Sequence, residues 1–378
     1  MKKTLLFHPP VNRLTAGKSS PETFDRSIEA FENRKYETSL RYLLDSVCPG
    51  VRTPSNTVAR GEYTIPHGPL RIGIKLEKDR LSITAPLVSL TTSGKVAMLR
   101  QAAALNFNDL DLVRLVPEGE GLTFKFSCPL IYSHPQKIKR VLEEICRTGE
   151  KYDYEFIDQF EAERLSSPCF IPYAPEKVRY VYDAVQSACK ECLDAVSYFE
   201  NSRKFSEEWN LIRATLLKLF YVAQPQGKLR HTLTKAIDDM DRNMPLQELN
   251  ADAKETLRQL QEESLEELSA SLYAVHTFVP DKKSSNLQKL RERYESCYKQ
   301  AAAWMEAGEY RKVCLRLTGE IYDIYYRYYV DSQLDSLFSD ALKETSAQPW
   351  VAAAPRLFEL FDNIMQGRIK KDHAPAAA

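Results

Sequence analysis

The order of elements in residues 70–147 constrains the fold more than any other feature of the chain: strand, strand, helix, strand, strand, helix. Every second residue of 70–76 is apolar, and a similar alternation returns in 81–86 after a charged turn at 77–80. Such alternation is typical of antiparallel strands with one buried face. Pro86 is expected to end the pairing or to lie at a sheet edge, because proline cannot donate to a strand ladder.

The second half of this run repeats the scheme. Residues 111–116 and 122–126 form the second predicted hairpin, and glycines in its turn supply positive φ values. Between the hairpins, 95–107 predicts a helix, and Pro135 opens a closing helix, because helices accept proline in their first turn. The expected apolar stripe of the first helix is Val96, Leu99, Ala103 and Phe107. The expected apolar face of the closing helix is Ile138, Val141, Leu142, Ile145 and Cys146.

Prolines and the loss of strand patterns divide the chain into segments. Three prolines in 168–175 separate a mixed part from a part in which every pattern is helical. The expected segments are an irregular N-terminal arm (1–20), an α/β domain (21–166), a proline-rich linker (167–175), an all-helical domain (176–365) and a disordered tail (366–378). The predicted fold class is α+β: a small antiparallel sheet with flanking helices, then an all-α domain of helical hairpins without strands.

Charge, hydropathy and cysteine use exclude several classes of protein. The 52 basic and 52 acidic residues balance, so no overall charge favours nucleic acid or an anionic membrane as a partner. No apolar run reaches the ~20 residues that span a bilayer, and the apolar start of the chain ends at His8, short of the ~7–15 residues of a signal-peptide core. The eight cysteines are scattered on apolar faces, as in a reducing compartment, so we expect a cytoplasmic protein.

A short pattern recurs at three places in the chain. Around 31–36, 199–205 and 305–310, an apolar helix end meets a short polar turn, and an aromatic residue opens a second amphipathic helix. Helical hairpins of the tetratricopeptide kind use this arrangement. Because the spacing between the copies is uneven, three unrelated helix–turn–helix units explain the pattern as well, and both interpretations remain open.

Motifs that carry chemistry are scarce, and each has a structural interpretation. Cys189 and Cys192 form the only Cys-x-x-Cys pair, but they lie in the middle of a predicted helix, where packing explains them better than metal or redox chemistry. The six histidines lack metal-binding spacing, and the acidic residues at 238–241 indicate a solvated helix end. We therefore expect no catalytic, cofactor-binding or metal-ligating residue, no cofactor and no enzymatic activity.

Residues 321–330 are unusually rich in tyrosine. Apolar rings fall on several sides of the predicted helix, which indicates a helix that is buried on most sides or that serves a partner. Core packing is the first interpretation, and an interface is the alternative.

The first part of the chain has the layout of a known family. A leading helix at 24–47 precedes both hairpins and their helices. The local sequences at 81–86, 99–108 and 141–146 follow the sequence pattern of that family. Residues 21–165 thus resemble the type III secretion chaperone-like fold, in particular its YbjN-like branch. The resemblance implies a small α/β module, often dimeric, that binds an extended or partly helical client over its sheet and grooves. Members of the family are usually short, so the long helical region departs from it.

These observations predict a non-enzymatic protein-binding module, chaperone-like or adaptor-like. The α/β domain would hold a client polypeptide by sheet-edge or groove contacts, and the helical domain would dock to a second protein partner. The residues expected to contact partners are Ile72, Ile74, Leu87, Val88, Phe124, Phe126, Tyr322, Tyr325, Tyr326 and Tyr329. Two alternatives are a structural subunit of a larger assembly and an enzyme with a site in the cleft between the domains.

Overall fold

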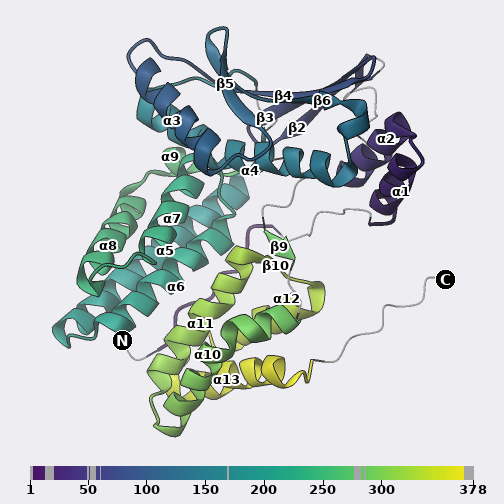
Figure 1. Ribbon diagram of the computed structural model, residues 1–378. Helices are drawn as coiled ribbons and strands as arrows, with labels where there is room; N and C mark the ends of the chain where they lie inside the picture. Colours follow the sequence, from purple (N-terminus) through teal and green to yellow (C-terminus); the bar gives the residue numbers. More distant parts are fainter. Residues whose placement is uncertain are drawn as a thin grey trace. The chain divides into compact units, whose positions relative to one another are not determined.

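The computed structural model describes residues 3–12, 21–48, 51, 57–59, 61–167, 170–275, 282–284 and 287–369. The chain forms two compact units (Figure 1). The α/β unit comprises Gly17–Pro172 and Ala274–Asp281. The helical unit comprises Met1–Ala16, Tyr173–Tyr273 and Lys282–Ala378. The α+β class predicted from the sequence is confirmed.

The α/β unit contains a six-stranded antiparallel sheet. Its strands are β1 (Thr57–Ala59), β2 (Glu62–His67), β3 (Leu70–Glu77), β4 (Arg80–Ser89), β5 (Arg114–Glu118) and β6 (Gly121–Pro129). They lie in the order β1-β2-β3-β4-β6-β5, so the two predicted hairpins, β3–β4 and β5–β6, are joined through the pairing of β4 with β6. Residue Lys78, with φ at 51°, allows the tight turn of the first hairpin.

Pro86 lies inside β4, and the pairing of β4 with β6 continues past it to Ser89. The pairing of β4 with β3 ends at Thr84, so the expectation that Pro86 ends the pairing holds on the β3 side and was wrong on the β6 side. On the β6 side the register shifts between Pro86 and Val88, and such a bulge needs no regular ladder bond at that point.

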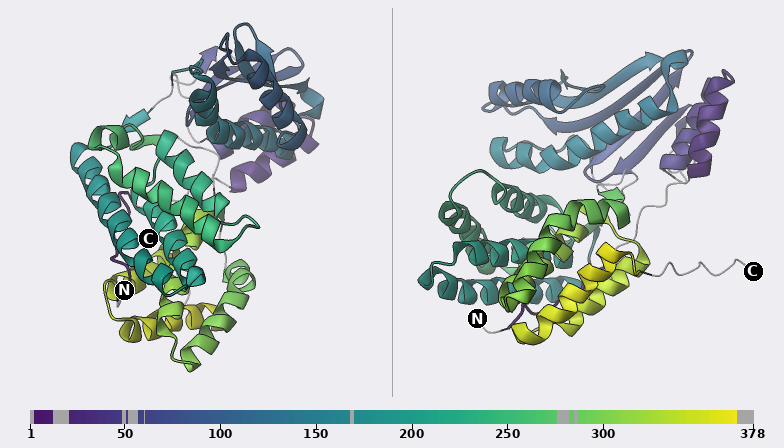
Figure 2. Two further views of the ribbon diagram at one scale, coloured as in Figure 1. Left: turned by 90° about the vertical axis from the view of Figure 1, so that its left-hand side faces the viewer. Right: turned by 60° about the horizontal axis from the view of Figure 1, so that its bottom comes forward.

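Two helices, α3 (Lys95–Asn108) and α4 (Pro135–Phe160), lie along the same face of the sheet (Figures 1 and 2). The apolar face expected for the closing helix is confirmed, because all five of its residues are buried in α4. Gly149 of α4 lets the helix approach β3 closely: a Cβ atom there would lie 2.3 Å from Cδ1 of the buried Leu70. His67 is buried at the end of β2, and its Nε2 lies 3.1 Å from Oε1 of Glu150 on α4.

The buried face of α3 differs from the predicted stripe. Met98, Ala102 and Leu105 pack into the core, whereas Val96 and Phe107 are exposed. The predicted stripe was wrong because α3 carries apolar residues on both faces, and the sequence pattern does not show which face is covered.

The remaining helices of the α/β unit form a hairpin, α1 (Pro21–Glu32) and α2 (Tyr36–Val47), and a 3-10 turn (Leu130–Tyr132) precedes α4. Leu40, Leu43 and Leu44 of α2 belong to the same hydrophobic core as the sheet. The leading helix expected at 24–47 is therefore interrupted at residues 33–35.

The helical unit is built around two neighbouring helices, α6 and α11, that are buried along most of their length. Its helices are α5 (Pro175–Asn201), α6 (Phe205–Ala223), α7 (Gly227–Asp239), α8 (Leu246–Glu262), α9 (Leu265–Ser269), α10 (Leu287–Glu306), α11 (Tyr310–Arg327), α12 (Ser332–Glu344) and α13 (Trp350–Gln366). Gly319 of α11 lies against α6, where a Cβ atom would meet Ala214 Cβ at an ordinary 3.5 Å.

The expectation of no strand in the helical part was wrong. Short strands occur at β8 (Tyr273–Val275), β9 (Lys283–Ser284) and β10 (Tyr328–Tyr329), and β9 and β10 pair in parallel. The expected linker also contains β7 (Phe170–Pro172). Strands of two or three residues leave too short a pattern to be seen in a sequence. The expected disordered tail was placed too early, because Gln366 ends α13 and the N–H of Arg368 donates to Asn363 O; residues 370–378 lie outside the described residues.

The recurring sequence pattern marks three helix ends with the same hydrogen bonding. Arg34, Arg203 and Gly308 have φ values of 58°, 52° and 70°, so each lies in the left-handed region. In each turn this residue donates its N–H to the carbonyl three positions earlier, and the next residue donates to the carbonyl five positions before it. This is the Schellman arrangement, which ends a helix and starts a new direction. The turn alone accounts for the sequence similarity.

The N-terminal arm, residues 3–12, belongs to the helical unit. Its backbone N–H groups donate to the turn between α12 and α13 and to α6: Thr4 donates to Gln348 O and Val11 to Val222 O, each at 2.9 Å. The side chains of Leu5 and Val11 are buried in the core of the helical unit.

The centre of the arm lies beside a buried ammonium group. Lys218 of α6 donates to the carbonyl of Leu6 at 2.5 Å, and its Nζ lies 3.8 Å from Glu191 of α5. Burial lowers the pKa of Lys218 to about 8, although the negative charge of Glu191 acts to raise it. Burial, aided by the positive charge of Lys218, lowers the pKa of His8 to about 4.

Two glycines in helices test how closely neighbouring elements pack. We expect Gly149→Ala to destabilise the protein by about 1–3 kcal/mol, because overpacking against Leu70 outweighs the ~1 kcal/mol gain in helix propensity. Gly319→Ala should instead stabilise it by about 0.5–1 kcal/mol, since the added methyl group makes ordinary contacts. Urea denaturation measures both changes. Equal effects of the two substitutions would contradict the assignment of close contact to Gly149.

Acid should release the N-terminal arm before the rest of the helical unit unfolds. His8 is neutral in both attached and free arms above pH 6.5, but only the free arm accepts a proton readily between pH 6.5 and 4. Attachment therefore weakens as the pH falls through this range. Hydrogen exchange, corrected for the intrinsic rate, should show a loss of protection at residues 4–11. In a His8→Gln variant the loss of protection between pH 6.5 and 4 should be clearly smaller, and an unchanged pH dependence would refute the role of His8.

Candidate functional site

One apolar face of the α/β unit is exposed on α3. Val96 is 64% exposed and Phe107 is 90% exposed. With Arg100 and Ala103, which are also exposed, they form one stripe at spacings of four, three and four residues. We call these four residues the α3 outward face. It lies opposite the buried Met98, Ala102 and Leu105.

This face differs from an ordinary solvated helix surface. Single exposed apolar residues are common, but Val96, Ala103 and Phe107 share one side of a helix with Arg100 between them, and exposed apolar residues that gather on one face often mark a contact with another molecule. Arg100 is the charged group on the stripe, and within the described residues it makes no salt bridge. The face therefore offers apolar contact and one positive charge.

The hairpin residues that the sequence suggested as partner contacts lie in the core. Ile72, Ile74, Leu87, Val88, Phe124 and Phe126 are all buried. As surface groups they were wrongly assigned, because the apolar side of the sheet is the side that α3 and α4 cover. Period-two alternation identifies an apolar face but does not show whether helices cover it.

The tyrosines of α11 are mainly part of the core, which was the first interpretation of that run. Tyr322 and Tyr325 are buried and Tyr326 is half-buried; Tyr329, which lies beyond the end of α11 in β10, is also half-buried. The Tyr325 ring lies 4.6 Å from that of Tyr221, and its hydroxyl donates to Asp335 Oδ1 at 2.7 Å. These contacts leave Tyr322 and Tyr325 no free surface for a partner.

A second candidate site is a cluster of arginines and carboxylates in the helical unit. Its centre is Asp323 of α11, which is 2% exposed. The carboxylate accepts hydrogen bonds from Arg213 Nη2 at 2.7 Å, Arg327 Nε at 2.9 Å and the Tyr294 hydroxyl at 2.9 Å. A third arginine, Arg293, lies nearby: its Nη2 is 3.7 Å from Oδ2 of Asp323. The arginine–carboxylate cluster comprises Arg213, Asp241, Arg293, Arg316, Glu320, Asp323 and Arg327.

The pKa values of the two buried carboxylates of this cluster are shifted in opposite directions. Burial alone raises the pKa of Asp323, but the guanidinium groups of Arg213 and Arg327 outweigh it, and the pKa lies below its usual value. Burial dominates at Glu320 and raises its pKa, although Arg316 lies 2.7 Å away and opposes the shift. Asp323 is therefore held as a carboxylate.

The cluster lines a pocket of about 390 Å³ together with Trp209, Tyr294, Ser296, Cys297 and Gln300. Sequence reasoning missed it, although a signal was present. Arg316, Glu320, Asp323 and Arg327 follow each other at spacings of four, three and four residues in α11, so they form one charged stripe on a helix that is otherwise mostly apolar. Arg213 likewise stands within the apolar run of α6.

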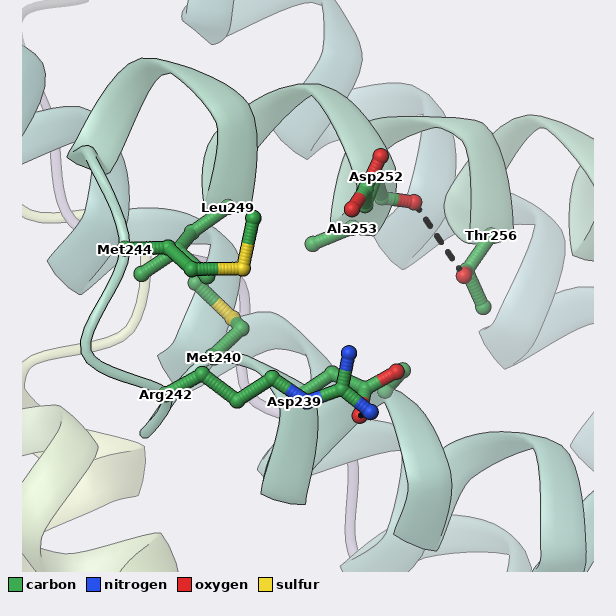
Figure 3. Close-up of a pocket in the computed structure, with 9 residues that line it drawn as sticks. Asp239, Met240, Arg242, Met244, Leu249, Asp252, Ala253 and Thr256 are labelled. Atoms are coloured by element: carbon green, nitrogen blue, oxygen red, sulfur yellow. Dashed lines mark hydrogen bonds and ion pairs between the residues drawn. The ribbon is translucent and has the colours of Figure 1, made fainter.

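Other candidates are weaker. A hollow between α7 and α8, lined by Met240, Met244 and Leu249 among others, has a volume of about 30 Å³, roughly that of one water molecule (Figure 3). Within the acidic run at 238–241, Asp239 ends α7 and pairs with Arg242, whereas Asp241 belongs to the cluster.

Cys189 and Cys192 lie in the middle of α5, as the sequence indicated, and both are fully buried. Burial raises the pKa of each thiol to about 12, so neither is a thiolate near neutral pH. In the part of the chain that the structure describes, no group of three or more histidine, cysteine or acidic residues is arranged to hold a metal ion.

No family model matches the chain, and no curated protein matches it. Within the described ranges, no helix combines the length and apolar character that crossing a membrane requires.

Asp323 should be essential to the stability of the helical unit. Asp323→Asn leaves the buried guanidinium of Arg213 without its closest negative partner, so we expect a loss of about 3–5 kcal/mol in the free energy of unfolding. Asp340→Asn is the matched control, because that carboxylate is exposed and lies 3.7 Å from Lys343, and it should cost less than about 1 kcal/mol. Urea denaturation distinguishes the two. A loss below 1 kcal/mol for Asp323→Asn would contradict the central role of its charge.

Proposed function

We propose that the protein is a non-enzymatic protein-binding module and that it holds a partner polypeptide on the α3 outward face. The observation that carries the proposal is the exposure of Phe107 and Val96 on a helix whose opposite side is already packed in the core. A stripe of this kind fits the apolar side of a second helix, with anchors at intervals of three and four residues. The resemblance of residues 21–165 to chaperone-like modules supports the same class of function.

Charge favours an acidic partner. Arg100 lies in the middle of the stripe, so an amphipathic helix with Glu or Asp beside its apolar residues would pair with it. Two copies of the α3 outward face would bring two Arg100 side chains into one interface without a carboxylate on either stripe. The partner is therefore a different, acidic helix, and self-association through α3 is the competing outcome.

We place this activity in the cytoplasm, because the seven cysteines that the structure describes are free thiols.

Binding can be measured with two fluorescently labelled helical peptides that share one leucine stripe and differ only in flanking residues, Glu in one and Lys in the other. The Glu peptide should bind the full chain more tightly, as read from fluorescence anisotropy. Phe107→Ser should weaken its binding about tenfold or more, because a large aromatic anchor is lost. Arg100→Glu should reverse the preference, so that the Lys peptide binds more tightly.

The control is Tyr132→Ser, which removes an aromatic ring that is also exposed on the α/β unit but lies away from α3. This variant should bind the Glu peptide as the wild type does. Equal binding of both peptides to the wild type, or no effect of Phe107→Ser, would reject the proposal. Sedimentation that shows a dimer lost on Phe107→Ser would replace the acidic partner by a second copy of the chain.

A further inference from the structure

We propose that the arginine–carboxylate cluster is a binding site for a small oxyanion, a molecule that carries a carboxylate or phosphate group. The site lies in the helical unit, so it would give the protein a ligand in addition to the partner proposed for α3. Its pocket, of about 390 Å³, falls in the size range of small-molecule sites.

The charge of the pocket lining favours an anion. Four arginines face three carboxylates, so the lining keeps one net positive charge when all seven groups are ionised. This positive charge is not spread evenly over the four arginines. Asp323 is shared by several donors, whereas Arg293 is 42% exposed on its side chain and approaches Asp323 only to 3.7 Å, beyond hydrogen-bond range. Arg293 is therefore the guanidinium most free to contact a ligand.

A buried donor without a hydrogen bond points to the same place. Arg213 is 8% exposed, and its Nε–H makes no hydrogen bond. An oxygen of Asp241 lies 3.6 Å from this nitrogen, too far for a hydrogen bond. The Nε of Arg316, which also lines the pocket, is likewise buried without a hydrogen-bond partner. Buried donors of this kind cost free energy unless an acceptor completes them, and an oxyanion supplies acceptors.

Aromatic rings orient two of these guanidinium groups. Arg213 lies 5.5 Å from the centre of the Trp209 ring, and Arg293 lies 5.8 Å from the centre of the Tyr294 ring. A ring beside a guanidinium holds the plane of the group and leaves its edge for hydrogen bonds. The edge of a guanidinium matches the paired oxygens of a carboxylate or phosphate group.

The position of the site follows from three helices. Trp209 and Arg213 are one turn apart on α6, Arg293 and Cys297 are one turn apart on α10, and α11 contributes its charged stripe. A purely structural ion-pair network would also join these helices. The two interpretations differ in one respect: a structural network needs no acceptor from outside the protein, whereas the proposed site does.

Isothermal titration calorimetry of the full chain with inorganic phosphate and with succinate, each at constant ionic strength in sodium chloride, tests the proposal. At least one of the two should bind saturably at one site, and the tighter of them identifies the oxyanion class. Arg293→Gln should weaken that binding at least tenfold, while the midpoint of thermal unfolding without ligand stays unchanged, because this side chain is exposed and lacks a close hydrogen bond. Arg213→Lys, which keeps the charge but removes the planar donor edge, should also weaken binding.

The matched control is Arg179→Gln on α5, which removes an exposed arginine of the same unit that is paired with Asp183. It should leave binding unchanged. Failure of both phosphate and succinate to bind saturably would overturn the proposal, as would equal binding by Arg293→Gln and the wild type. If Arg213→Lys does not fold, the Arg293→Gln result decides alone.

Discussion

The burial of the Asp323 carboxylate is the constraint on which the helical unit depends. A charge removed from water destabilises a fold by several kcal/mol unless close donors compensate it. Arg213 and Arg327 supply charged donors and Tyr294 supplies a hydroxyl, so α6, α10 and α11 must keep the distances that these bonds require. The two most buried helices of the unit are thus fixed by charge as well as by apolar packing.

The two units depart from the usual distribution of residues in opposite ways. The helical unit has charged groups inside it, around Asp323, and the α/β unit has apolar groups outside it, on the face that carries Phe107. Both arrangements reduce stability compared with a wholly apolar core and a wholly polar surface. Such departures are where function is usually found, because they persist although local packing does not require them.

Much of the fold followed from local patterns. The two hairpins, the apolar face of α4 and the buried tyrosines of α11 were predicted because each depends on a repeat within a few consecutive residues. The candidate sites were not predicted. The α3 stripe was read as its buried face, and the charged stripe of α11 was hidden by the tyrosines beside it. The continued pairing of β4 beyond Pro86 was not predicted because it depends on β6, which lies far along the chain.

The sequence by itself determined the type of most elements, the α+β class and the presence of two apolar faces on α3. Only the tertiary structure decided which of those faces is covered, that β4 pairs with β6 and that four arginines meet around Asp323. The reason is physical. Periodicity is set by the backbone geometry of neighbouring residues, whereas exposure and charge pairing depend on which distant segments pack against them.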